Sequence, residues 1–364
     1  MLCVATIALL ALPGCLGGSG QPAELTSLSA LWKSAAQATA SSNGLVTLSA
    51  AGDVNFGDGV TPTLTAGGLD YPFSGVGQAL ESTDLSFVNL ECCISSVGSP
   101  VPGKEFTFRG PPDSAEALSA GGVKVVSLAN NHTKDFGAAA LEETFGHLKQ
   151  EGIAYCGAGR NAAEAYSPAV LEARGKKVAF VAFTWVIPDG WPATATSPGC
   201  ATTSDRARVA ATIRDARGKA DYVVASFHWG IELATSPNSE QRDLAHLAVD
   251  SGADMVLGHH PHVVQGFELY RNRLIAYSLG NFVFSPPRPE SARSVMLMTL
   301  MGPGGLVEAK VVPAVISGCR PVILNGSAAD AWAGTIAAYS KALGTTMNVA
   351  GGRGYISGGA AQKL

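Results

Sequence analysis

The chain has 364 residues, 46% of them hydrophobic, and a formal net charge of −4 at pH 7. This composition supplies enough apolar residues for a large core, and the length fits either two domains or one large α/β domain. Proteins that bind nucleic acid usually concentrate Lys and Arg on one face, so the near absence of basic clusters argues against nucleic acid as a partner.

The chain begins with an apolar segment, residues 1–12, which ends in Leu12-Pro13-Gly14-Cys15. This segment is too short to span a bilayer as a helix but has the length of a signal-peptide core. A small residue followed by Cys after such a core resembles a bacterial lipoprotein cleavage site, so we predict a signal peptide over residues 1–15 with Cys15 lipidated. The alternative is an ordinary secretory signal with an incidental cysteine. Either interpretation predicts an exported cell-envelope protein, and the first adds a lipid anchor in a membrane.

Residues 16–43 contain Gly/Ser-rich and Ala/Ser-rich stretches, which are typical of a flexible tether. From residue 44 onward, strand patterns alternate with helical patterns, for example at 138–150 and 153–156, and this alternation indicates an α/β domain. Two predicted hairpins, around residues 174–176 and 271–273, indicate that the sheets are mixed. We predict one folded domain over residues 44–325, followed by an Ala/Gly-rich C-terminal helix and tail over residues 326–364.

Five predicted strands are each followed by side chains that favour metals. The strands are expected at residues 45–51, 84–88, 123–128, 222–227 and 255–257. The side chains that follow them are Asp53 and Asn55, Glu91, Asn131 and His132, His228, and finally His260 and His262. Ligands of open α/β sheets bind outside the carboxyl ends of the strands, so these groups are expected to converge in one crevice. Asp, Glu, Asn and His are hard and borderline ligands, which suit Mn, Fe, Zn or Mg.

His260-Pro261-His262 is the densest of these clusters. In an extended loop, residues two apart point the same way, so both imidazoles are expected to reach one metal or a metal pair. A single HxH motif is common, and only the joint pattern of all five strand ends is specific.

Six segments carry a family resemblance. They are GDVNFG from Gly52, FVNLE from Phe87, SLANNHTKDFG from Ser127, FHWGIE from Phe227, GHHPHVVQGFE from Gly258 and YSLGNFVF from Tyr277. Together they resemble the CapA family of poly-γ-glutamate capsule biosynthesis proteins, a branch with the calcineurin-like metallophosphoesterase fold. The resemblance covers roughly residues 44–325. It implies an α/β fold in the form of a four-layer αββα sandwich of two mixed sheets, with a dinuclear metal centre at the strand ends.

The resemblance also implies roles for individual residues. Asp53 with Asn55 occupies the position of the phosphoesterase DxH pair, and Glu91 occupies that of the Asp that bridges two metals. Asn131 matches the Asn of the GNH motif, His228 the isolated metal-binding His, and His260 and His262 the two His of GHxH. His132 falls where phosphoesterases keep a His that protonates the leaving group or stabilises the transferring phosphoryl group.

The sequence departs from the phosphoesterase pattern at Asn55, which stands where a His is usual, and at Glu91, which stands for Asp. A neutral amide is a poorer ligand than imidazole, so the expectation is one or two divalent ions, Mn, Fe or Zn. Glu232, four residues beyond His228, is a candidate base or a residue that orients a ligand.

The function implied by the resemblance is that of a metal-dependent hydrolase of the poly-γ-glutamate or capsule pathway. Its substrate would be a phosphoester or a γ-glutamyl amide, in an anionic polymer or a phosphorylated envelope molecule, and its partners the components of a polymer synthesis or export complex. The alternative is a non-catalytic surface component that helps to export or retain an anionic polymer.

Overall fold

The computed structural model describes residues 44–57 and 59–359. The predicted signal peptide, Cys15 and the tether lie outside these residues. Within the described part of the chain, no helix combines the length and the apolar character needed to cross a membrane.

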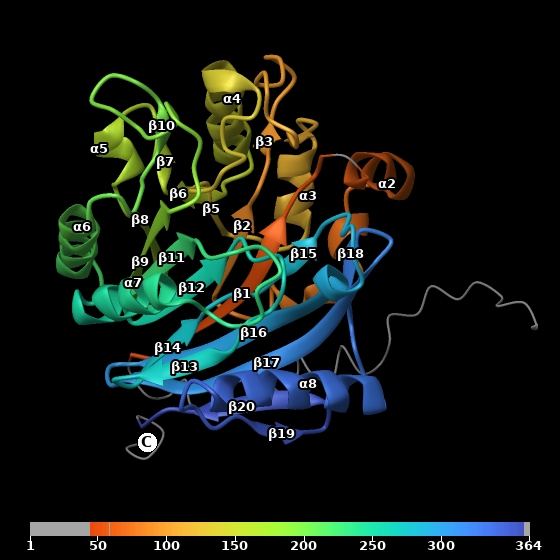
Figure 1. The fold of residues 1–364 in the computed structure, drawn as a ribbon, viewed down its shortest axis with the longest axis vertical. Coiled ribbons are helices and arrows are strands. Elements are labelled where there is room, and N and C mark those ends of the chain that lie inside the picture. The colour runs from red at the N-terminus through yellow and green to blue at the C-terminus, as the bar shows by residue number, and fades with distance from the viewer. Residues whose placement is uncertain (1–43, 58, 360–364) are drawn as a thin grey trace, which may run out of the picture.

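The larger sheet has ten strands (Figure 1). Its order is β19-β20-β17-β16-β1-β2-β5-β6, with β15 beside β1 and β18 beside β17. In chain order, the strands are β1 (Val46–Val54), β2 (Leu85–Leu90), β5 (Val125–Ser127), β6 (Ala154–Cys156), β15 (Asn281–Val283), β16 (Arg293–Gly302), β17 (Gly305–Ser317), β18 (Arg320–Ile323), β19 (Asn348–Ala350) and β20 (Arg353–Ser357). Strand β1 runs parallel to β2 and antiparallel to β16, so this sheet is mixed.

The smaller sheet has six strands in the order β13-β14-β12-β11-β9-β8. They are β8 (Ala169–Ala173), β9 (Lys176–Thr184), β11 (Tyr222–His228), β12 (Met255–His259), β13 (Phe267–Tyr270) and β14 (Arg273–Ala276). Two short pairs stand apart from both sheets, β3 (Cys93–Ile94) with β4 (Arg109–Gly110) and β7 (Ala158–Gly159) with β10 (Gly199–Cys200).

Helices pack around the two sheets (Figure 1). They are α2 (Val60–Gly67), α3 (Ser114–Ala120), α4 (Gly137–Gln150), α5 (Ala162–Ala165), α6 (Arg206–Lys219), α7 (Ser239–Asp250) and α8 (Gly326–Lys341), with the short 3-10 helices η1 (Tyr71–Phe73), η2 (Gly77–Ala79) and η3 (Glu290–Ala292). Helices α2, α3 and α4 share a hydrophobic cluster with the larger sheet, and α6 and α7 share another with the smaller sheet.

A third hydrophobic cluster lies between the two sheets. The rings of Phe87 on β2 and Phe180 on β9 stack across it with centroids 5.7 Å apart. Strand β9 shows why the layers form, because Phe180 faces the other sheet while Val181 and Phe183 face helices α6 and α7. Side chains alternate across a strand, so a strand that is apolar at every position must be covered on both faces. The predicted αββα sandwich of two mixed sheets is confirmed.

Both predicted hairpins are present, β8 with β9 and β13 with β14. Each turns over two residues with positive φ, Arg174-Gly175 and Arg271-Asn272, as expected for the turns that match the twist of antiparallel strands. The C-terminal region contains more than the predicted helix and tail. Helix α8 packs against β17 and β13, and β20 pairs with β17 in the larger sheet. The domain therefore continues past residue 325, to at least residue 357.

Candidate metal centre

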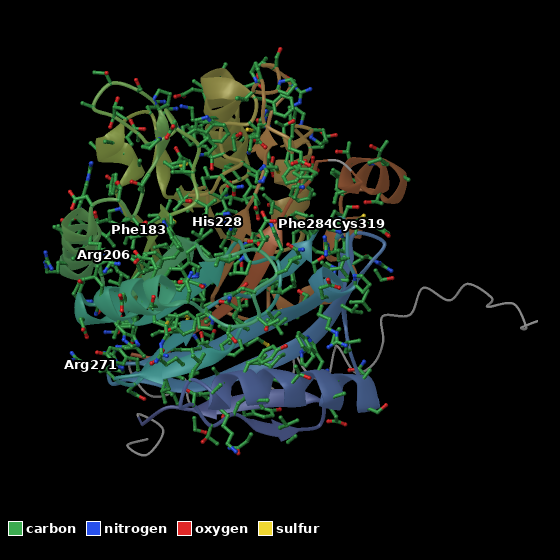
Figure 2. The ribbon with its side chains drawn as sticks, in the orientation of Figure 1. Phe183, Arg206, His228, Arg271, Phe284 and Cys319 are labelled. Atoms are coloured by element: carbon green, nitrogen blue, oxygen red, sulfur yellow. The ribbon has the colours of Figure 1, made fainter. Side chains whose placement is uncertain are left out.

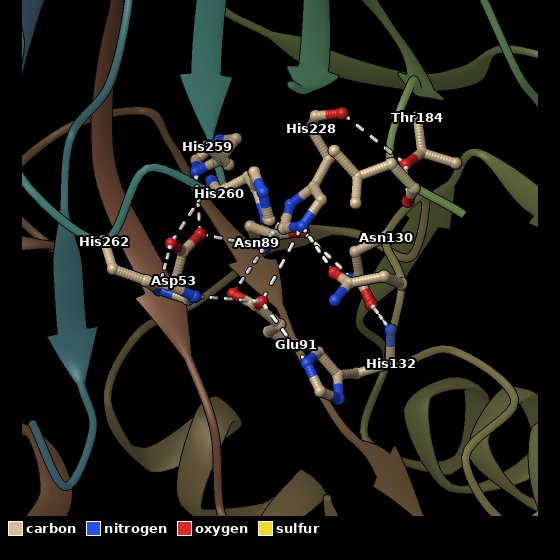
Figure 3. Close-up of polar contacts among 12 residues, drawn as sticks. Asp53, Asn89, Glu91, Asn130, His132, Thr184, His228, His259, His260 and His262 are labelled. Carbon is tan, nitrogen blue, oxygen red and sulfur yellow. Dashed lines mark hydrogen bonds and ion pairs between the residues drawn. The ribbon is translucent and has the colours of Figure 1, made fainter. Parts of the chain in front are cut away.

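The predicted site residues meet where the carboxyl ends of the two sheets come together (Figure 3). The larger sheet contributes Asp53 near the end of β1 and Glu91 directly after β2. The smaller sheet contributes His228 at the end of β11, with His260 and His262 in the loop after β12. Figure 2 shows His228 in the middle of the molecule, and its side chain is only 1% exposed. These five residues come from segments up to about two hundred positions apart, as the strand-end pattern predicted.

Glu91 is the centre of the cluster. Its Oε1 atom is buried and has no hydrogen-bond partner among the described residues. Three imidazole Nε2 atoms surround Oε1, those of His228 at 3.6 Å, His262 at 3.8 Å and His132 at 3.9 Å. These separations are too long for hydrogen bonds, but two ligand atoms that share one tetrahedral ion are roughly 3.3–3.6 Å apart. The arrangement is therefore one that a cation would complete.

Asp53 is fully buried and is contacted on both oxygens. Oδ1 accepts a 2.9 Å hydrogen bond from Asn89 Nδ2 and lies 3.3 Å from His259 Nδ1, while Oδ2 lies 3.4 Å from His262 Nδ1. Only a glycine fits at position 52, directly before Asp53, because a Cβ atom on that residue would stand 1.7 Å from the Gly280 carbonyl oxygen. That close approach lets Asp53 N–H donate to Gly280 O at 2.9 Å, which ties β1 to the start of β15.

The loop that carries His260 and His262 is not extended, so the predicted reason for their convergence is wrong. Both residues have left-handed backbone conformations, with φ of 93° and 57°. Non-glycine residues adopt such conformations at a cost and are enriched at functional sites. The loop still brings the two rings together, with centroids 5.8 Å apart. His262 Nδ1 is 2.8 Å from Asn281 Oδ1 at the start of β15, which fixes the orientation of that ring.

Burial and neighbouring charges shift the pKa values of the cluster in opposite directions. Burial, and then the neighbouring Asp53, raise the pKa of Glu91 well above its usual value. Burial alone would also raise the pKa of Asp53, but the adjacent imidazoles of His259 and His262 outweigh it and hold that pKa well below its usual range. Burial lowers the pKa of His260 to about 3. Burial likewise lowers the pKa of His262, but Glu91 and Asp53 outweigh it and raise this pKa to about 10.

These shifts have one physical cause. Two carboxylates buried side by side are stable only if a positive charge lies between them. A proton on His262 supplies that charge in the metal-free protein, and a divalent ion would supply it better. The neutral imidazoles of His228 and His260 keep lone pairs for a metal, because burial lowers both of their pKa values.

His132 lies at the edge of this cluster and is held by Asp135. The Nδ1 atom of His132 is 2.6 Å from Asp135 Oδ2, so its ring presents Nε2 to the site. Burial lowers the pKa of His132. The ring also stacks on Phe108 with centroids 4.2 Å apart. Only the Nε2 atom is therefore available for proton transfer at the centre.

Asn131 also joins the cluster, because its Oδ1 atom lies 2.7 Å from His228 Nε2. Asn55 is buried, but its Oδ1 atom accepts a 2.7 Å hydrogen bond from Gly57 N–H, and no contact in the described structure joins it to the other candidate ligands. Glu232 is exposed in the loop after β11 and makes no hydrogen bond or ion pair with the cluster in the residues described. It acts on Glu91 only through its charge, which raises the pKa of Glu91.

Asn89 and Lys104 also belong to the site, although neither was among the predicted ligands or catalytic groups. Asn89 Nδ2 donates to Asp53 and lies 3.4 Å from His228 Nδ1, so it connects the two sheets. A sequence pattern could have identified Asn89 as a site residue, because Asn89 and Glu91 are two positions apart at the end of β2. Lys104 contacts Asp135 and His132, but it lies in a loop with no pattern that points to the site.

The described residues fit a metal centre in two overlapping positions. Glu91, His260 and His262 form one group, and Asp53, Glu91 and His228 form the other, with ligand atoms in each group within 4.8 Å of one another. Both groups contain Glu91, and its unpartnered Oε1 atom is the feature that a cation would satisfy. Imidazole and carboxylate donors suit Mn, Fe or Zn.

Comparison with known proteins finds relatives in bacterial capsule synthesis. The family model described as "Bacterial capsule synthesis protein PGA_cap" matches residues 47–286. The capsule biosynthesis protein CapA of Bacillus anthracis is 31% identical over 277 residues, which cover 74% of this chain and 67% of that protein. The PGA biosynthesis protein CapA of Bacillus subtilis is 29% identical over 282 residues, with 77% and 74% covered.

Among solved structures, the NAD nucleotidase of Haemophilus influenzae is similar with a TM-score of 0.42 and 12% identity. The match covers 79% of this chain and 55% of the nucleotidase chain.

Proposed function

This chain belongs to the family of bacterial capsule synthesis proteins, and on that premise we propose that it is a metal-dependent hydrolase of a cell-envelope polymer or its precursor. The observation that supports this most strongly is the buried, unpartnered Oε1 atom of Glu91 amid three imidazoles. A merely structural cluster would be expected to satisfy each buried polar atom. A cluster of candidate metal ligands that faces a candidate acid, here His132, is typical of a catalytic centre.

Asp53, Glu91, His228, His260 and His262 would hold one or two divalent ions, with Asn131 as a further ligand. When bound, such an ion supplies Lewis-acid polarisation of the scissile phosphoryl or carbonyl group and makes water more acidic. His262 gives up its extra proton when the ion binds, because the ion then balances the charges of Glu91 and Asp53.

His132 is the proposed proton donor to the leaving group. Asp135 holds the Nδ1 proton, so His132 would first take up a second proton from solvent on Nε2, which faces Glu91, and then give that proton to the leaving group. Stacking on Phe108 keeps the ring in this orientation. The same geometry serves an alkoxide leaving group of a phosphoester or the amine of a γ-glutamyl amide, and both remain candidate substrates.

We further propose that the protein works outside the cytoplasm, anchored through Cys15, where an anionic polymer or phosphorylated envelope substrate is available. The names of its relatives support a role in poly-γ-glutamate synthesis, and membership of a synthesis or export complex is part of the proposal.

The test measures metal content and turnover on the same samples. The protein is purified without chelator, loaded with Mn, Fe or Zn, and assayed on a panel of phosphodiesters and γ-glutamyl amides. His132→Ala should keep its metal and lose about 10²–10⁴-fold in rate, since a positioned acid contributes that much. His147→Ala, in helix α4, is the matched control and should retain full activity.

Two results would contradict the proposal, the first its hydrolase activity and the second the role of His132. One is a metal-loaded parent that turns over no member of the panel while it binds poly-γ-glutamate, the outcome expected of a non-catalytic surface component. The other is a His132→Ala variant with retained metal and a rate within about threefold of the parent, which would remove His132 from the mechanism.

A further inference from the structure

Lys104 reaches the centre from the segment between β3 and β4, far from the strand ends that supply the other groups. Its ammonium contacts Asp135 Oδ1 and the backbone carbonyl oxygen of Asn131, and it lies 3.1 Å from His132 Nδ1. The side chain is only 18% exposed, and the ammonium lies 4.9 Å from the centre of the Trp191 ring. A lysine is costly to bury in this way unless its charge is paired.

Asp135 connects Lys104 to His132, because its carboxylate contacts both side chains. Asp135 is buried and divides its oxygens, with Oδ1 toward Lys104 and Oδ2 toward His132 Nδ1. Oδ2 also accepts a 2.6 Å hydrogen bond from Phe108 N–H. Since the His132 Nδ1 proton is directed at Asp135, Lys104 does not bond the imidazole itself but acts on it through the shared carboxylate.

Lys104 also restrains Asn131, the residue that precedes His132. Its contact with the Asn131 carbonyl holds the backbone from which the Asn131 side chain reaches His228, at 2.7 Å. One ammonium thus restrains a candidate metal ligand and the candidate acid, which are adjacent in sequence but have different tasks. A lysine can do this because its compact head directs separate N–H groups at separate acceptors.

We propose that Lys104 is a positioning residue that holds the His132 ring and the Asn131 segment in their working orientation. The inference rests on the proposed hydrolase function, in which His132 transfers the proton. Lys104 touches neither the candidate metal ligands of the smaller sheet nor the Glu91 oxygen, so its removal should affect the rate of the chemical step more than metal binding or substrate affinity.

The kinetic test compares three variants of the metal-loaded protein. Lys104→Met keeps the length of the stem but removes the ammonium, and should lower kcat by about 10–100-fold with KM and metal content within about threefold of the parent. Lys104→Arg keeps the charge, yet its planar head suits the two acceptors less well, so it should lose less than the methionine variant. Lys134→Met is the matched control, because Lys134 Nζ donates to the carbonyls of Gly190 and Pro198 and does not contact Asp135.

A parental kcat in Lys104→Met overturns the proposal, and so does a loss confined to KM, which would mean that Lys104 binds substrate. If Lys104→Met does not fold, Lys104→Gln, which also removes the charge, decides, and a parental kcat there together with a parental His132 spectrum overturns the proposal.

A second readout needs no turnover and separates this inference from the proposed function. The chain has seven histidines, so nitrogen-15 labelling of histidine gives a simple spectrum, in which the signals missing from His132→Ala identify His132. In the metal-free parent, His132 should show one tautomer with its proton on Nδ1. Lys104→Met should show exchange between the two tautomers, and Lys134→Met should match the parent. If the parent hydrolyses nothing but these spectra are found, the hydrolase proposal fails while the positioning role stands. Identical His132 signals in the parent and Lys104→Met overturn the positioning role.

Discussion

Glu91→Gln should have opposite effects in the metal-free and the metal-loaded protein. Burial raises the pKa of Glu91, so the folded state binds this proton more tightly than the unfolded state does. Its stabilising contribution is complete below the unfolded pKa of about 4.5 and is lost as the pH rises through the raised folded pKa. At neutral pH without metal, a neutral glutamine should therefore leave the protein at least as stable as the parent.

With metal the order reverses, because Glu91 belongs to both candidate ligand groups. An ion present at about 100 times its Kd stabilises the parent by about 2.7 kcal/mol. At about 2 °C for each kcal/mol, this raises Tm by about 5 °C. If the loss of the carboxylate weakens binding by about 100-fold, the same ion concentration stabilises the variant by only about 0.4 kcal/mol, or about 1 °C.

The measurement is thermal unfolding of parent and variant, each with chelator and with added Mn²⁺ or Zn²⁺. Glu268→Gln is the matched control, because Glu268 is also buried but bonds Tyr277 and His246 away from the cluster, and it should keep the full metal-induced shift. A Glu91→Gln protein whose Tm rises with metal as much as that of the parent would refute the assignment of Glu91 as a ligand. If metal-free Glu91→Gln is far less stable than the metal-free parent, the conclusion that the charge of Glu91 is costly to bury is refuted.

Three further predictions concern the ligands and the anchor. His260→Ala should lose bound metal while keeping its fold, measured by elemental analysis and circular dichroism, and a parent that itself holds no stoichiometric metal would remove the site. Burial lowers the pKa of His262, but Glu91 and Asp53 outweigh it and raise this pKa to about 10 from an ordinary value of 6.5. The metal-free parent should thus lose stability between pH 6.5 and 10, and urea unfolding of His262→Gln should lack this fall; an equal fall in both proteins would show that His262 is not its source. Cys15→Ala should move the protein from the membrane fraction to the soluble fraction, because lipid anchoring needs the acylated cysteine, and a variant that sediments with membranes as firmly as the parent would exclude the lipoprotein interpretation.

Local patterns in the sequence predicted an α/β domain with mixed sheets and most of the cluster, and the αββα sandwich was expected from the family resemblance. Strands such as β9 and β11 are apolar at nearly every position, which fits strands that are covered on both faces in an α/β domain. Parallel strands place their carboxyl ends at one edge, so Asp53 and Glu91 could be expected to meet there before any contact was known, whereas His228 joins them from the other sheet. The α/β assignment and the strand-end positions depend only on neighbouring residues and on the period of the pattern.

Contacts between distant segments were decided only by the tertiary structure. His260 and His262 converge through left-handed backbone and not through an extended loop, and Asn281 orients the His262 ring. Asn55 follows the same strand as Asp53, yet its amide turns to the local Gly57 N–H. Lys104 reaches Asp135 from a loop whose sequence has no periodic pattern. In each case the outcome depends on which backbone and side-chain partners the packed layers bring within hydrogen-bonding distance. The period of a strand or helix carries no information about those partners.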